Sequence, residues 1–218
     1  MQGGDEFTGS GVRVIHGTAA AVLAGHDAFD AGLYRAVVGV SRHTGELNGL
    51  VGWWSDYGLV LFVVLAALAW WRARDRGLRA AASALWVPGA MAAAYVLNSV
   101  VKLIAQEQRP CRAMPAVHIA VACPGASDYS FPSNHAVLAG AAAVAVCLAA
   151  GRLLGTIAVL DALVIAASRV YIGVHYPHDV AVGLLVGALV AAGGGFVLTR
   201  TLDRLVPVRP LRTPSEQR

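Results

Sequence analysis

Apolar residues fill most of the chain, and short polar segments divide them into long blocks. The blocks cover about residues 50–71, 82–104, 134–150, 153–170 and 179–199. A transmembrane helix needs roughly 20 mostly apolar residues, so each block can cross a bilayer, although the third and fourth are near the lower limit. The pattern therefore predicts an all-α, multi-pass transmembrane helical bundle with five core spans.

The two ends of the chain differ from this core. Residues 12–24 are apolar but short, and they contain Arg13 and His16. We expect one or two interfacial helices within residues 12–43, and a sixth span stays open. The first residues lack the basic segment and the long apolar core of a cleavable signal peptide. The first span is therefore expected to be the targeting signal. The predicted units are an N-terminal tail with interfacial helices (1–45), a membrane domain (46–200) and a basic cytoplasmic tail (201–218).

Charge is scarce and its placement predicts an orientation. Only 14% of residues are charged, against about a quarter in soluble domains. The net charge of +4 does not indicate nucleic-acid binding, because the basic residues are scattered between the apolar blocks without interleaved aromatic residues. Arginines gather at residues 72–79, at Arg152 and after residue 199. With five spans these segments share one side, which the positive-inside rule makes cytoplasmic, so the 105–133 and 170–178 loops face outward.

Three polar clusters fall at the outward ends of the predicted spans. They are Lys102, Arg109 and Pro110; Pro132, Ser133, Asn134 and His135; and Ser168, Arg169, His175 and Asp179. Guanidinium and ammonium groups hold phosphate oxygens, and imidazoles attack phosphorus or transfer protons. Prolines at helix starts leave backbone N–H groups free, and a helix N-terminus attracts anions. The clusters therefore predict a site for a phosphate ester.

The clusters resemble the signatures of the type-2 phosphatidic acid phosphatase superfamily. Its patterns K-x6-R-P, P-S-x-H and S-R-x5-H-x3-D occur here in order and at the required spacings, and the resemblance covers roughly residues 50–200. Many members have glycine in place of Asn134. After glycine, asparagine is the residue that best tolerates the left-handed backbone conformation. We therefore expect the chemistry to survive with an altered local backbone.

The resemblance implies a role for each matched residue. His175 would be the nucleophile that forms a phosphohistidine, Asp179 would orient it, and His135 would protonate the leaving group and then activate water. The phosphoryl oxygens would be bound by Lys102, Arg109, Arg169 and Ser133, with backbone N–H groups near Asn134 assisting. Neither a metal nor another cofactor is expected, because the three cations supply the positive charge.

An outward-facing site at the membrane surface predicts a lipid phosphate as substrate. The sequence around the motifs most resembles bacterial undecaprenyl-diphosphate phosphatases of the bacitracin-resistance type, which implies a plasma-membrane enzyme that recycles the cell-wall lipid carrier. The alternatives are a phosphatase for phosphatidylglycerophosphate, phosphatidate or a lipid-linked sugar phosphate. A non-catalytic transporter or scaffold is a distant alternative, because the motifs are intact. The oligomeric state stays open.

Several residues outside the motifs also carry expectations. Cys111 and Cys123 bracket the outer loop and are expected to form a disulfide, the alternative being two free thiols. Cys147 is expected to be an inert packing residue within its span. Asp161, near the middle of a span, is expected to be a buried structural acid rather than a functional one.

Three further residues lie near the predicted site. His178 is expected to be a solvated loop residue. His118 and Glu107 lie in the outer loop and are candidates for substrate contact, although a purely structural role is the more expected one for each.

Overall fold

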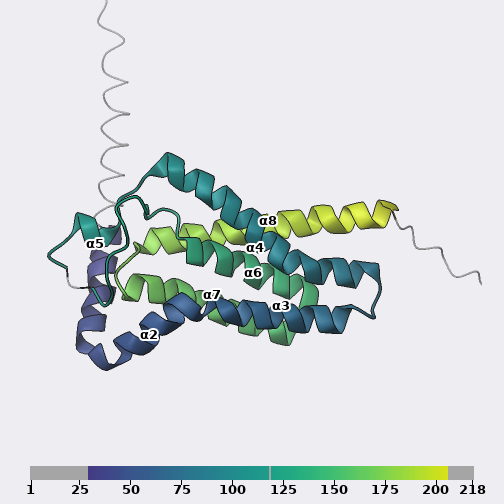
Figure 1. Ribbon diagram of the computed structural model, residues 1–218, viewed down its shortest axis with the longest axis horizontal. Helices are drawn as coiled ribbons and strands as arrows, with labels where there is room; N and C mark the ends of the chain where they lie inside the picture. Colours follow the sequence, from purple (N-terminus) through teal and green to yellow (C-terminus); the bar gives the residue numbers. More distant parts are fainter. Residues whose placement is uncertain (1–28, 118, 206–218) are drawn as a thin grey trace, which may run out of the picture.

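The computed structural model describes residues 29–117 and 119–205, and these residues form helices and connecting loops without a strand. A helix over residues 29–43 comes first. It is followed by α2 (Gly45–Tyr57), α3 (Leu59–Ala73), α4 (Leu78–Ala105), the short α5 (Pro110–Ala113), α6 (Asn134–Ala150), α7 (Arg152–Tyr171) and α8 (Pro177–Leu205). The all-α prediction is confirmed (Figure 1).

The predicted spans correspond to these helices with small differences at their ends. α4, α7 and α8 are each long and apolar enough to cross a membrane, and the bent pair α2 and α3 makes a fourth if it counts as one span. α6 begins and ends where the sequence predicted. It is apolar, but with 17 residues it is slightly too short to count as a membrane-spanning helix by length. The structure thus supports three or four spans by length and composition, and the fifth stays a prediction.

The first predicted span is broken at Gly58, where α2 and α3 meet with a bend of 46°. A Cβ atom at Gly58 would lie 2.7 Å from the carbonyl oxygen of Trp54, so the position requires glycine. The Trp54 indole Nε1 donates to Asp161 Oδ1 on α7 at 3.1 Å. Asp161 is buried, and this bond ties it to the bend, as expected of a structural acid.

α6 and α8 run side by side from the same end of the bundle, in close backbone contact. A Cβ atom at Gly140 of α6 would collide with the backbone of Leu184, and one at Gly187 of α8 would collide with the carbonyl of Val137. Small residues at a helix contact allow such an approach. The two helix starts consequently lie together, and the backbone N–H of Ser133 donates to the carbonyl of Asp179 at 3.1 Å.

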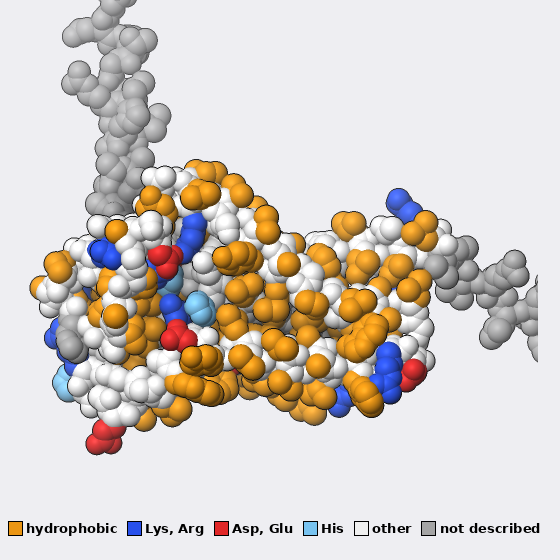
Figure 2. All heavy atoms as spheres, in the orientation of Figure 1, with side chains coloured by type: hydrophobic (Ala, Val, Ile, Leu, Met, Phe, Trp, Pro, Cys, Tyr) orange, Lys and Arg blue, Asp and Glu red, His pale blue; other side chains and the backbone are white. Residues whose placement is uncertain are grey.

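The bundle separates the motif residues from the arginine-rich segments. The α3–α4 turn, the α6–α7 turn and the end of α8 lie at one end, while α5 and the 106–133 loop lie at the other (Figure 1). In Figure 2, apolar side chains cover the middle of the molecule and charged ones gather towards its two ends. The arrangement agrees with the predicted topology, although which end faces the cytoplasm stays a prediction.

The N-terminal helix over residues 29–43 lies across the motif end, with Tyr34 and Val38 fully buried against the rest of the molecule. The Tyr34 hydroxyl donates to the carbonyl of Gly173 at 3.0 Å. The expected helix at residues 12–24 lies outside the described residues. α8 continues to Leu205, past the domain boundary expected at residue 200.

Candidate active site

The start of α8 fixes the carboxylate of Asp179. Pro177 opens the helix, and Asp179 in the first turn accepts from the backbone N–H of Tyr176 at 2.8 Å, as an acidic residue does in a capping box. The same oxygen, Oδ2, accepts from the Ser130 hydroxyl and lies 3.1 Å from His175 Nδ1. Three neighbours therefore hold this buried carboxylate in one orientation.

His175 lies just before α8 and is almost fully buried. Its Nδ1 faces Asp179, and its Nε2 lies 3.0 Å from Arg109 Nη1, which must be the donor in this contact. Burial lowers the pKa of His175 to about 4, with Arg109 acting in the same direction and Asp179 opposing. The imidazole is therefore neutral near pH 7, with the Nε2 lone pair directed at a guanidinium. A histidine nucleophile must be neutral, and its Nε2 lone pair must be released by Arg109 before it can attack.

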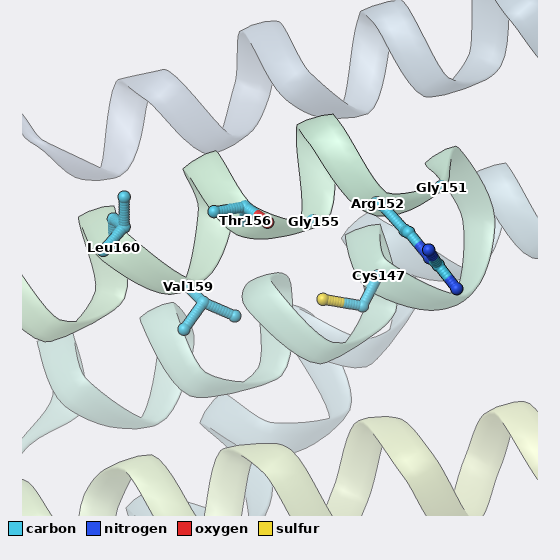
Figure 3. Close-up of a pocket in the computed structure, with 7 residues that line it drawn as sticks. All are labelled: Cys147, Gly151, Arg152, Gly155, Thr156, Val159 and Leu160. Carbon is cyan, nitrogen blue, oxygen red and sulfur yellow. The ribbon is translucent and has the colours of Figure 1, made fainter.

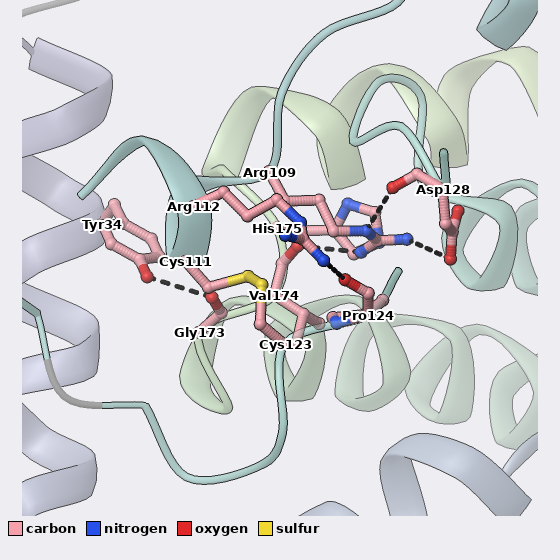
Figure 4. The surroundings of a disulfide bond; sticks show 10 residues. All are labelled: Tyr34, Arg109, Cys111, Arg112, Cys123, Pro124, Asp128, Gly173, Val174 and His175. Atoms are coloured by element: carbon pink, nitrogen blue, oxygen red, sulfur yellow. Dashed lines mark hydrogen bonds and ion pairs between the residues drawn. A yellow bond between two sulfur atoms is a disulfide. The ribbon is translucent and has the colours of Figure 1, made fainter. Parts of the chain in front are cut away.

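Arg109 and Lys102 share one carboxylate, that of Asp128. Lys102 Nζ lies 2.9 Å from Asp128 Oδ1, and Arg109 Nη2 lies 2.9 Å from Oδ2. The Arg109 Nε also donates to the backbone carbonyl of Asp128 at 2.8 Å, and its Nη1 to that of Val174 at 2.9 Å. Figure 4 shows Arg109 between Asp128 and His175. The sequence alone does not single out Asp128, because no motif spacing relates this loop residue to the cations.

The third cation, Arg169, comes from the last turn of α7 and is buried. Its Nη1 donates to Ser55 Oγ at 3.0 Å and to Asp56 Oδ1 at 3.1 Å, both on α2. Within the described part of the chain, its buried Nε has no hydrogen-bond partner. Ser55 and Asp56 were also missed, since they belong to a short polar stretch within the first predicted span and match no motif.

The start of α6 supplies Ser133, Asn134 and His135. Ser133 is the N-cap residue and is fully buried, and its Oγ has no partner among the described residues. Asn134 is helical, and its Oδ1 accepts from Asn98 Nδ2 at 2.6 Å. It does not take the left-handed conformation that glycine would permit, so the expected distortion of the backbone is absent here. His135 is half-buried and close enough to Arg169 and His175 to interact with them electrostatically.

All eight predicted site residues therefore meet at one end of the bundle. They are Lys102, Arg109, Ser133, Asn134, His135, Arg169, His175 and Asp179. Three buried cations, a neutral imidazole paired with a carboxylate, and a second imidazole can bind a phosphoryl group and exchange it with water. Figure 2 shows basic, acidic and histidine side chains inside a hollow on this end, bordered by apolar side chains.

The expectation that His178 is a solvated loop residue is wrong. Its Nδ1 lies 2.8 Å from Asp30 Oδ2, and its Nε2 lies 3.2 Å from both Glu107 Oε2 and Asp179 Oδ1. Its ring also stacks on Tyr176, with centroids 5.6 Å apart. The N-terminal helix that carries Asp30 folds over the site, and the hydrophobic pattern could not place that helix.

Glu107 therefore contacts His178, while its contact with substrate stays untested. The group Glu107, His178 and Asp179 offers ligand atoms within 4.8 Å of one another, which is a spacing that a metal ion could also use. His118 lies outside the described residues.

The predicted disulfide is present, since Cys111 and Cys123 are bonded with their Cα atoms 6.0 Å apart. It joins α5 to the outer loop two residues after Arg109, and the nearby Arg112 donates to the carbonyl of Pro124 (Figure 4). Cys147 lies within α6 and its Sγ packs against Gly155, as expected of a packing residue, but it is exposed in a groove on the surface of the bundle (Figure 3).

Comparison with known proteins agrees with this geometry. The family model of the PAP2 superfamily matches residues 83–202. The chain is 30% identical to the undecaprenyl-diphosphatase BcrC of Bacillus subtilis, over 80% of this chain and 85% of that protein. It is 37% identical to a decaprenylphosphoryl-5-phosphoribose phosphatase of Mycobacterium tuberculosis, over 63% of this chain and 73% of that protein.

Among solved structures, the crystal structure of LpxE from Aquifex aeolicus superimposes with a TM-score of 0.60 and 25% identity, covering 78% of this chain and 94% of that one. The family match spans more than half of the chain and includes all three motif clusters. The chain therefore belongs to the PAP2 superfamily and is an integral membrane phosphatase of the lipid-phosphate class.

Proposed function

We propose that this protein hydrolyses a polyprenyl diphosphate to the monophosphate at the outer face of a bacterial plasma membrane. The observation that carries the proposal is the buried ring of His175, held between Asp179 Oδ2 and Arg109 Nη1. The similarity to an undecaprenyl-diphosphatase over most of both chains supports this choice of substrate. The arginine-rich end of the bundle would lie in the cytoplasm.

In the proposed reaction, His175 Nε2 attacks the terminal phosphorus, and the bond from that phosphorus to the bridging oxygen breaks. His135 gives its proton to that oxygen, so the polyprenyl monophosphate leaves. His135 then removes a proton from water, which attacks the phosphohistidine and releases inorganic phosphate with His175 restored. Lys102, Arg109 and Arg169 neutralise the charge on the phosphoryl oxygens throughout.

A lipid-linked sugar phosphate is the second candidate substrate. The identity of 37% to a decaprenylphosphoryl-5-phosphoribose phosphatase favours it, although that match covers less of this chain than the match to the undecaprenyl-diphosphatase. Both candidates present a terminal phosphate on a polyprenyl carrier, so the phosphate-binding residues serve either one. A non-catalytic role is disfavoured because every motif residue is in place.

Phosphate release in detergent tests the proposal. The purified full chain is assayed with polyprenyl diphosphate, a polyprenyl-linked phosphosugar, phosphatidylglycerophosphate and phosphatidate, each with and without EDTA. We expect the polyprenyl diphosphate to have the highest kcat/KM, no loss in EDTA, and inhibition by vanadate, which resembles the five-coordinate phosphoryl group. Preference for the phosphosugar would select the second candidate, and strict dependence on a divalent ion would contradict the metal-free mechanism.

A further inference from the structure

We propose that Asp128 is an internal competitor for the phosphoryl group: its carboxylate occupies Lys102 and Arg109 when no phosphoryl group is bound, and substrate must displace it. The inference rests on the proposed function, because it assigns these two cations to phosphoryl binding. Each carboxylate oxygen of Asp128 lies 2.9 Å from one cation. Two oxygens bridging two cations is also the arrangement that a phosphoryl group would adopt.

The carboxylate of Asp128 is much more exposed than the two cations that it contacts. The side chains of Lys102 and Arg109 are 10% and 4% exposed, whereas that of Asp128 is 49% exposed. A buried cation without a partner is strongly destabilising, so an internal anion keeps this pair stable between turnovers. Partial burial alone would raise the pKa of Asp128, but Lys102 and Arg109 outweigh it and hold that pKa below its usual value. Asp128 therefore remains an anion.

The carboxylate can leave without moving the loop. The backbone of Asp128 is fixed on both sides, since its N–H donates to the carbonyl of Gly125 at 3.1 Å and its carbonyl accepts from Arg109 Nε at 2.8 Å. Two residues on, Ser130 N–H donates to the carbonyl of Glu107 at 2.7 Å. Rotation of the half-exposed side chain into water is thus enough to free both cations.

Such a competitor changes how all anions bind. The affinity of every ligand that binds the two cations is lowered by one common factor. That factor is the fraction of time for which the cations are free. Product phosphate then leaves sooner, and the singly charged phosphodiester lipids of the membrane bind too weakly to block the site. The terminal phosphate of the substrate, with close to two negative charges, still binds.

The test compares Asp128→Asn with Asp203→Asn. Asp203 is a matched control because its side chain is also 49% exposed and pairs with an arginine, Arg79, at 2.8 Å, but at the opposite end of the bundle. Calorimetry on the full chain in detergent gives the dissociation constants of orthophosphate and vanadate, and turnover gives the inhibition constant of phosphatidylglycerol. Binding of the two oxyanions is measurable even if the substrate assignment is wrong, so the two proposals fail separately.

We expect Asp128→Asn to tighten orthophosphate and vanadate by the same factor, about tenfold if the carboxylate occupies the cations roughly nine-tenths of the time. Phosphatidylglycerol should become a measurable competitive inhibitor, and Asp203→Asn should change nothing. Weaker oxyanion binding, unequal factors or no change would each overturn the proposal. Asp128→Ser is prepared in parallel, and thermal unfolding is measured first. If both variants fail to fold, Asp128 serves the fold and the proposal is also wrong.

Discussion

The two ends of the bundle contain the same kind of ion pair in opposite surroundings. At the arginine-rich end, Arg79 and Asp203 lie 2.8 Å apart and the arginine is 60% exposed. At the site end, Arg109 and Asp128 lie 2.9 Å apart and the arginine is 4% exposed. An exposed pair contributes about 0–1 kcal/mol, whereas a buried cation left without its partner is strongly destabilising. Burial, rather than charge or distance, therefore gives the site end its chemical capacity.

The largest expected effect concerns His175, which is 1% exposed. His175→Gln should lower kcat by about 10⁴-fold or more, because no other group replaces an attacking nucleophile. Hydrolysis of polyprenyl diphosphate by the purified variant measures the loss. His43→Gln is the control, since His43 is an exposed histidine bonded only to the carbonyl of Gly39 among the contacts described. A His175 variant with substantial activity would remove the nucleophile from the mechanism.

The next largest effect is expected from replacing Arg109, the buried arginine of the site-end pair. Arg109→Gln should lower kcat/KM by about 10²–10³-fold, the loss typical of removing one preorganised donor to a developing charge. It should also raise the pKa of Asp128, since that carboxyl loses one of the two cations that lower its pKa. Steady-state kinetics with the folded variant gives the first result. Retention of full activity would mean that Lys102 and Arg169 suffice.

The disulfide is a covalent feature of the site end alone. The double variant Cys111→Ser with Cys123→Ser should lose roughly 3 kcal/mol of unfolding free energy, as chain entropy predicts for a short closed loop. Thermal unfolding with and without reductant measures this, and reductant should affect only the native chain. Cys147→Ser serves as the control because Cys147 is unpaired. Equal unfolding temperatures for all three proteins would show that the bond is dispensable.

A smaller effect is expected at His178, which contacts the site without belonging to a motif. His178→Gln removes the ring between Asp30, Glu107 and Asp179, so the orientation of Asp179 relaxes. A misplacement of this kind should lower kcat about tenfold with little change in KM. A change confined to unfolding temperature would restrict His178 to holding the N-terminal helix.

The smallest effect lies at the opposite end. Arg79→Gln should change the unfolding free energy by less than about 0.5 kcal/mol and leave kcat/KM unchanged, because its exposed pair is screened by water. Chemical unfolding and the phosphate-release assay measure both quantities. A loss comparable to that of Arg109→Gln would break the comparison, since burial would then no longer distinguish the two ends.

The parts that the sequence predicted are those governed by local rules. The bounds of α6 follow from an apolar block that starts after Pro132, and the His175–Asp179 pair follows from a spacing of four residues at a helix start. Matched motifs then identified all eight candidate residues. These features depend on neighbours a few positions away, so periodicity and spacing are sufficient to find them.

The parts that were missed depend on contacts between distant segments. Asp128 meets Lys102 from 26 positions away, Asp56 meets Arg169 from 113, and Asp30 meets His178 from 148. Nothing in the local sequence marks Asp128 or Asp30 as a partner of a buried cation or of an imidazole. Asp56 is different, because an acid inside a predicted span is itself a signal. The excess of cations over acids in the motifs is a second signal that could have prompted a search for all three.

The contact between α6 and α8 has a consequence for motion during turnover. Because the backbones touch at Gly140 and Gly187, the helices that carry Ser133 and Asp179 cannot slide or separate without losing that contact along much of their length. They form a rigid half of the site. Any opening and closing that admits a lipid and releases phosphate is therefore expected in the outer part of α4, which diverges from the bundle in Figure 1.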